Sequence, residues 1–150
     1  MAQHTIEQII DLFQSVEPSM RLELLLDYAK KLPALPERLK ALRDRGVSRV
    51  PECQTPVFLF IEAEAGAVRI HADVAEESPT VRGFVSILID AYDDEAPSVV
   101  ATAPPDLLHR LGLGELLRMT REVGLSAIVT RLKREASKAT AQPVAAAQRT

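Results

Sequence analysis

Cysteine is almost absent from this sequence: 150 residues contain a single one, Cys53. One thiol cannot form a disulfide within the chain, and it cannot supply the four-cysteine ligand set of a zinc or iron–sulfur site. The three histidines are far apart in the sequence, so they do not suggest a metal site either. We therefore expect the chain to hold no metal and no cofactor.

Aromatic residues are few, and the chain has neither a net positive charge nor a long apolar run. The chain has four Phe, two Tyr and no Trp, and its net charge is −3. Such a surface neither neutralises phosphates nor stacks bases, so nucleic acid is not an expected partner. No apolar run approaches the roughly 20 residues that span a bilayer, and the N-terminus lacks the pattern of a secretory signal. These absences predict a cytoplasmic protein without membrane contact.

The length and composition are those of one globular domain. Domains cluster at roughly 100–150 residues, and 47% of this chain is hydrophobic, which is enough for a core without disulfides or metal. Apolar periodicity is lost from Ala139 onward, where Ala, Gln and Thr dominate. We expect a single domain over residues 1–138 and a disordered tail over residues 139–150.

Apolar residues at helical spacing predict two N-terminal helices, over residues 5–16 and 19–32. Thr5 followed three residues later by Gln8 is typical of a capping box at the start of the first helix. The next segment, residues 33–46, carries two prolines and a basic run and ends at Gly46. It predicts a loop with one or two helical turns.

The middle of the chain favours strands. Residues 47–50 form a short extended piece, residues 56–61 are β-branched and aromatic, and residues 68–73 alternate apolar with polar side chains after a turn at residues 64–66. Ser78 and Pro79 then predict the start of a helix to Tyr92, prolines divide short helices after it, and a last helix covers residues 120–137. The order predicts an α+β fold: two helices, an antiparallel sheet of about three strands, then several helices packed on one face.

Cys53 lies between two of the extended pieces. A free cysteine is usually a small buried hydrophobe. Here Pro51 and Pro56 flank it with polar neighbours, so the segment cannot complete a central strand, and we expect an exposed loop. Arg49 favours the thiolate and Glu52 opposes it, so the sequence leaves the sign of the pKa shift open.

Four segments together resemble the SufE family of sulfur-acceptor proteins in iron–sulfur cluster assembly. Residues 50–59, VPECQTPVFL, resemble its V-x-G-C-Q-S-x-V-W-L signature. Residues 81–84, VRGF, are similar to its V-R/K-G-L stretch, and residues 121–128, REVGLSAI, to its R-x-x-G-L-x-A-M stretch. With LPALP at residues 32–36, the resemblance covers roughly residues 5–137 in the right order.

The sequence departs from the family pattern at several positions. Glu52 replaces the glycine before the cysteine, Thr55 replaces serine, and Phe58 replaces tryptophan. The family's D-S-D-A stretch becomes residues 75–78, AEES, in which the second acidic position survives as Glu77. Because glutamate rarely adopts positive φ, the backbone beside the cysteine is expected to differ from that of relatives.

The resemblance implies a function and a partner. Cys53 would accept persulfide sulfur from a pyridoxal-phosphate-dependent cysteine desulfurase, stimulate that enzyme and relay the sulfur to an iron–sulfur scaffold. It implies an accessory carrier rather than a stand-alone enzyme, and one cysteine favours a carrier over a cluster-holding scaffold. Gln54, Glu77, Arg82 and Arg121 are the implied partner-binding or loop-supporting residues.

Two other classes of function stay open. A hydrolase using Cys53 would need a histidine as base, and neither motif contains one. A non-catalytic adaptor of related fold, with a structural cysteine, is the alternative suggested by the departures at Glu52 and Phe58. A carrier must also protect its sulfur, so we expect the thiol to rest partly tucked against residues 57–59 and the approach near Leu42 and Val47.

Overall fold

The computed structural model describes residues 4–114 and 118–141, the side chains of residues 118–123 and 139–141 excepted. The elements in chain order are α1 (Ile6–Ser15), α2 (Pro18–Lys30), α3 (Glu37–Asp44), β1 (Val57–Glu64), β2 (Ala67–Val74), α4 (Pro79–Tyr92), α5 (Pro97–Ala101), α6 (Leu107–Arg110) and α7 (Arg118–Ala141). The α+β class and the order of elements are as predicted.

The sheet is an antiparallel hairpin of β1 and β2. Val57 lies opposite Val74, and Glu64 lies opposite Ala67. Between the strands, Ala65 has φ 53° and Gly66 has φ 81°, as a two-residue hairpin turn with two left-handed residues requires. Gly66 adopts this conformation without the steric cost that a Cβ brings.

The expected third strand is reduced to one bridge among the described residues. Arg49 pairs with Phe58 alone, through hydrogen bonds from Val50 N to Val57 O (2.8 Å) and from Leu59 N to Ser48 O (3.0 Å). Ser48 has φ 64°, so the chain turns out of the extended conformation immediately before the bridge. About three strands were predicted, and the structure has two because this turn stops the pairing.

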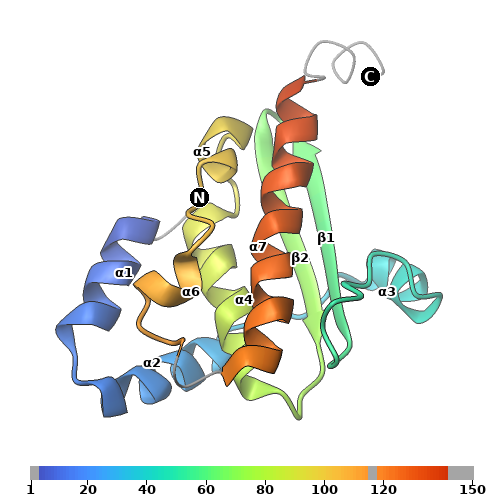
Figure 1. Cartoon of the computed structure of the whole chain (residues 1–150). Helices are drawn as coiled ribbons and strands as arrows, with labels where there is room; N and C mark the ends of the chain where they lie inside the picture. The colour runs from blue at the N-terminus through green and yellow to red at the C-terminus, as the bar shows by residue number, and fades with distance from the viewer. Residues whose placement is uncertain (1–3, 115–117, 142–150) are drawn as a thin grey trace.

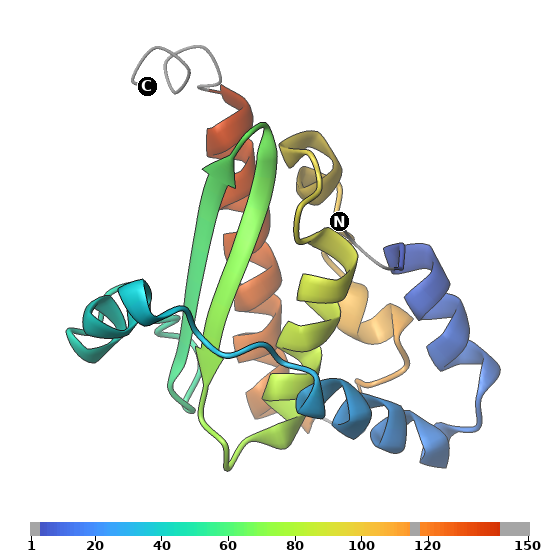
Figure 2. The ribbon, with the colours of Figure 1, turned by 180° about the vertical axis from the view of Figure 1, so that it is seen from behind.

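Helices cover one face of the hairpin. Figures 1 and 2, which view the molecule from opposite sides, place α7 and α4 on the same side of β1 and β2. The core lies between these layers, and its largest fully buried side chains include Leu59 of β1, Phe84, Ile87 and Leu88 of α4, and Leu125 and Ile128 of α7. Each such side chain contributes about 1.5–3 kcal/mol by leaving water, so this interface fixes where α7 runs beside β1.

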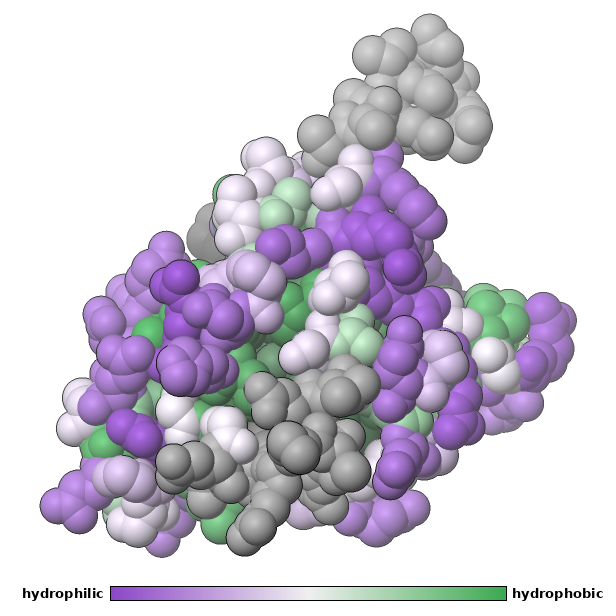
Figure 3. All heavy atoms as spheres, viewed as in Figure 1, coloured by the Kyte–Doolittle hydropathy of each residue, from purple (hydrophilic) through white to green (hydrophobic). Residues whose placement is uncertain are grey.

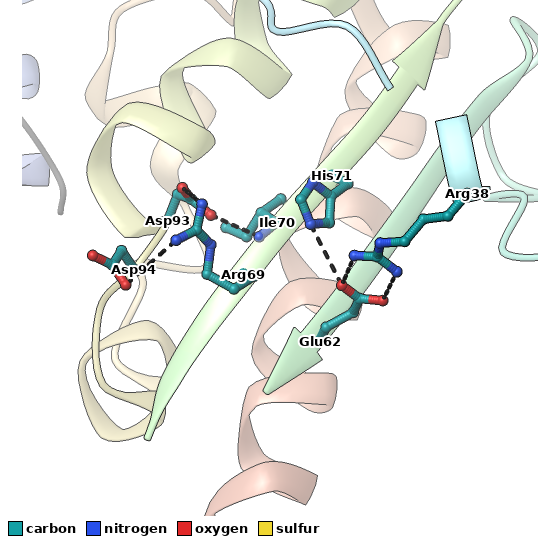
Figure 4. A network of polar contacts seen from close by, with 7 residues as sticks. All are labelled: Arg38, Glu62, Arg69, Ile70, His71, Asp93 and Asp94. Atoms are coloured by element: carbon teal, nitrogen blue, oxygen red, sulfur yellow. Dashed lines mark hydrogen bonds and ion pairs between the residues drawn. The ribbon is translucent and has the colours of Figure 1, made fainter. Parts of the chain in front are cut away.

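The other face of the hairpin carries charged side chains (Figure 4). Arg38 of α3 binds Glu62 through two hydrogen bonds of 2.8 and 2.6 Å, and His71 Nε2 lies 3.4 Å from the same carboxylate. Arg69 lies 3.3 Å from Asp93, whose Oδ1 accepts a hydrogen bond from Ile70 N at 2.8 Å. These contacts tie α3 and the loop after α4 to the hairpin.

A small apolar cluster anchors α3 near the start of β1. Leu35, Leu39 and Phe60 are buried together, with Leu42 and Phe58 packed against them. In Figure 2 the segment that joins α2 to α3 crosses this face of the hairpin. The cluster therefore holds the chain leading to Cys53 beside the β1 edge.

The helix ends follow the sequence closely, with two differences. The capping box of α1 is confirmed, since Gln8 N donates to Thr5 Oγ1 (3.1 Å) and Thr5 N donates to Gln8 Oε1 (2.9 Å). Ser78 precedes α4 as expected, but its side chain makes no capping bond. Helix α7 continues to Ala141, past the predicted end at residue 137, and residues 142–150 of the expected tail lie outside the described residues. Among the described residues, every helix is too short or too polar to span a bilayer.

Candidate functional site

The Cys53 loop, residues 51–56, is a tight connection between the Arg49 bridge and β1. Cys53 N donates to Val50 O at 3.2 Å, which closes the loop on itself. The far side of the loop is bonded to the segment before α4, because Ala75 N donates to Pro56 O (3.3 Å) and the Thr55 and Ser78 hydroxyls lie 2.7 Å apart. The loop is therefore held at both of its ends.

The thiol itself is directed at α7. Cys53 Sγ donates a hydrogen bond to the carbonyl oxygen of Gly124 at 3.4 Å, across 71 residues of sequence. A Cβ on Gly124 would lie 3.0 Å from Sγ and 3.3 Å from Cys53 Cα, which is tighter than ordinary packing. The missing side chain at Gly124 is thus what allows the loop to approach the helix so closely.

Cys53 is buried, and the residues that cover it are only partly those predicted from the sequence. Only 7% of Cys53 is exposed, so the expectation of a tucked side chain is confirmed. The expectation of an exposed loop holds for Glu52 and Gln54 but not for the thiol between them. Cys53 shares the main core cluster with Val57 and Leu59, as predicted, whereas Leu42 packs in the α3 cluster and Val47 is 37% exposed, so the predicted cover from these last two residues is wrong. No pattern near the cysteine indicated that α7 would take their place.

Burial keeps the thiol protonated. It raises the pKa of Cys53 from its ordinary 9.0 to about 11, with a further increase from the nearby Glu52 carboxylate and a partial decrease from Arg49. Because the thiolate is the nucleophilic form, Cys53 reacts slowly in this conformation.

No described side chain is hydrogen-bonded to the thiol as a catalytic base would be. Among the described residues, Cys53 Sγ is hydrogen-bonded to Gly124 O alone. His4 contacts the Asp90 carboxylate, and His71 contacts the Glu62 carboxylate. Within the described ranges, no three His, Cys, Asp or Glu side chains are placed to hold a metal ion. The chemistry available here is that of a sheltered thiol that must be released before it reacts.

The other residues singled out in the sequence are distributed around this loop. Gln54 is exposed beside Cys53, and Glu77 is exposed on the segment to which the loop is bonded. Arg82 is half-buried, and its Nη1 donates to Val74 O at 2.7 Å, at the end of β2. Arg121 lies in α7, and its side chain is outside the described residues.

Contacts that sequence reasoning missed also shape the site. Besides Gly124, they involve Thr55 with Ser78, and Arg131, whose Nη1 donates to Arg49 O at 2.8 Å. Only Gly124 carried a local signal, because an isolated glycine within a helical pattern costs about 1 kcal/mol relative to alanine and commonly has a packing reason. The hydroxyl pair and the arginine contact join distant segments, and no local pattern marks them.

Comparisons with known proteins place most of the chain in one family. The family model "SufE: Fe-S metabolism associated domain" matches residues 7–136. An uncharacterised SufE-like protein of Mycobacterium tuberculosis is 37% identical over 130 residues, which cover 86% of this chain and 89% of that protein. The sulfur acceptor protein CsdE of Escherichia coli is 33% identical over 106 residues, 69% of this chain and 68% of CsdE.

A solved structure shares the fold. The solution structure of a hypothetical protein from Thermus thermophilus has a TM-score of 0.78 and 35% sequence identity, covering 94% of this chain and 99% of that one. The family model spans the hairpin, the Cys53 loop and α7 as far as residue 136. The chain belongs to the SufE family, whose domain is associated with Fe–S metabolism.

Proposed function

We propose that this protein is a cytoplasmic sulfur acceptor that takes persulfide sulfur from a pyridoxal-phosphate-dependent cysteine desulfurase onto Cys53 and relays it for iron–sulfur cluster assembly. The observation that carries the proposal is the contact between Gly124 and Cys53, the one cysteine of the chain. This contact brings together two segments that resemble the family, residues 50–59 and residues 121–128. The relative CsdE, named a sulfur acceptor protein, supports the same role.

The transfer is a substitution at sulfur without net oxidation. Cys53 first loses its proton to solvent, and the thiolate then attacks the outer sulfur of the desulfurase persulfide. A new bond forms between Cys53 Sγ and that sulfur, while the bond to the desulfurase cysteine breaks and that cysteine leaves as a thiolate. Cys53 then carries the persulfide, and the desulfurase is free for another cycle.

Release of the loop exposes the thiol and activates it in the same step. With a pKa of about 11, roughly one Cys53 in ten thousand is a thiolate at pH 7. With the ordinary value of 9.0 the fraction is roughly one in a hundred. Partner binding that lifts Cys53 from Gly124 therefore raises the reactive fraction about a hundredfold, and new contacts with the partner offset the cost of opening.

The remaining motif residues support this step in two ways. Gln54 and Glu77 are exposed beside the loop, which suits contact with the desulfurase. Arg82 acts as a positioning residue, because its bond to Val74 O holds the end of β2 next to the segment that carries Glu77. Arg121 is assigned to partner contact by its match to the family motif.

Intact-mass analysis after incubation with a desulfurase and free cysteine tests the proposal. The wild-type protein should gain sulfur that a reductant removes, and Cys53→Ser should lose both this adduct and the stimulation of the desulfurase. Stimulation that survives in Cys53→Ser would favour the adaptor alternative, in which the cysteine is structural.

A further inference from the structure

Three of the arginine side chains that the structure describes stand out because no described residue pairs with them. Among the arginines whose side chains the structure describes, Arg45, Arg49 and Arg134 make neither an ion pair nor a side-chain hydrogen bond, and all three are exposed. The other described arginines are engaged by carboxylates or backbone carbonyls: Arg21, Arg38, Arg43, Arg69, Arg82, Arg110 and Arg131.

These three arginines lie on two neighbouring segments at the β1 edge. Arg45 caps the end of α3 and Arg49 forms the bridge to β1, and Figures 1 and 2 both show α3 beyond the β1 side of the hairpin. Arg134 follows Arg131 by one helical turn on α7, and Arg131 contacts the backbone of Arg49. Figure 3 shows hydrophilic side chains along the visible surface of α7. We call Arg45, Arg49 and Arg134 the arginine edge.

Exposed carboxylates lie on the Cys53 loop and on the segment bonded to it. Glu52 precedes the cysteine, and Glu76 and Glu77 lie on the segment bonded to its loop; all three are exposed and make no ion pair with a described residue. Exposed cations and exposed anions therefore both lie near the thiol, and Arg49 and Glu52 shift the pKa of Cys53 in opposite directions. A partner of uniform charge would be repelled by one of the two groups, so this arrangement selects an orientation.

We propose that the arginine edge is the docking surface for an acidic segment of the desulfurase, which lies along the outer edge of β1 while the desulfurase cysteine meets Cys53. This inference rests on the proposed sulfur transfer, because any protein that takes sulfur from or gives sulfur to Cys53 must cover the surface around it. Unpaired exposed arginines favour association with carboxylates, since no internal partner competes for them. Their main effect is on the rate and orientation of encounter, not on the chemistry at sulfur.

The test is the concentration of this protein that gives half-maximal stimulation of a cysteine desulfurase, measured over a salt series from about 0.05 to 0.5 M. The variant carries Arg45→Gln and Arg134→Gln; Arg49 is kept because it influences the pKa of Cys53. Arg110→Gln is the control, because it removes one positive charge outside the arginine edge: Arg110 lies on α6 and is paired with Asp106. A second variant, Arg45→Lys with Arg134→Lys, retains the charge.

At low salt the Gln variant should need about a fivefold higher concentration, with unchanged maximal stimulation, while the control and the Lys variant stay near wild type. At high salt the difference should vanish, because the screening length falls to about 4 Å. Equal half-maximal concentrations for wild type and the Gln variant at low salt would overturn the inference, as would an equal effect of Arg110→Gln. Sulfur uptake by the wild type separates the two proposals: if Cys53 gains sulfur but the Gln variant behaves normally, only the docking surface is wrong.

Discussion

The shelter of Cys53 predicts slow alkylation in the folded protein. At pH 8, a pKa of about 11 leaves roughly one thiolate in a thousand, whereas the ordinary value of 9.0 leaves roughly one in ten. Since the thiolate reacts and the thiol does not, iodoacetamide should modify the native protein about a hundredfold more slowly than the unfolded chain. Steric cover by α7 adds to this factor, because only 7% of the residue is exposed.

The pH profile identifies the cause of the slow reaction. In the unfolded chain the rate should rise tenfold per pH unit and level off above 9.0, while in the native protein the rise should continue to about 11. Intact mass after acid quenching measures the rate, and every adduct reports on Cys53 because the chain has no other cysteine. A desulfurase lacking its own sulfur-carrying cysteine should speed the native reaction. Equal rates for native and unfolded protein at pH 8 would refute the argument.

Three further predictions concern the loop and the tail. Gly124→Ala places a Cβ against Cys53, so we expect alkylation at pH 8 at least about tenfold faster than wild type, with Thr130→Ala on the exposed side of α7 as control. Thr55→Val leaves the buried Ser78 hydroxyl without its described partner, and urea denaturation should show a loss of about 1–2 kcal/mol in the free energy of unfolding. Removing residues 139–150 should leave the melting temperature within a few degrees and sulfur uptake unchanged; a larger fall would show that these residues pack on the core.

Local sequence signals located most elements because their causes are local. The capping box needs only Thr5 and Gln8, and the hairpin turn needs a residue such as Gly66 that tolerates positive φ. A third strand was predicted over residues 47–50, but the positive φ of Ser48 prevents it from forming. Positive φ is unusual for serine, and the sequence of residues 47–50 gives no sign of it. Three extended-looking segments therefore became two strands and one bridge.

The sequence motifs predicted which segments form the site, but they did not predict which residues of those segments are in contact. Cys53 and Gly124 each belong to a segment that resembles the family, but nothing in either segment says that the two touch. Their contact follows from the packing of α7 on the hairpin, which depends on buried side chains such as Leu125 and Ile128. A prediction from the sequence around the cysteine chose apolar side chains that are near in sequence, residues 57–59 with Leu42 and Val47, and so missed the helix.

The same contact also constrains the loaded protein. A persulfide adds a sulfur about 2.05 Å beyond Sγ, and Sγ already lies 3.4 Å from Gly124 O. A sulfur placed along that line would overlap the carbonyl, so the loaded Cys53 side chain must turn away or its loop must lift from α7. In either case the hydrogen bond to Gly124 O is lost, and with it part of what holds residues 51–56 against the helix. Amide hydrogen exchange should therefore be faster in residues 51–56 of the persulfide form than in the free thiol form, while the core of α4 exchanges at the same rate in both. Identical exchange in the two forms would show that the loop accommodates the added sulfur without leaving Gly124.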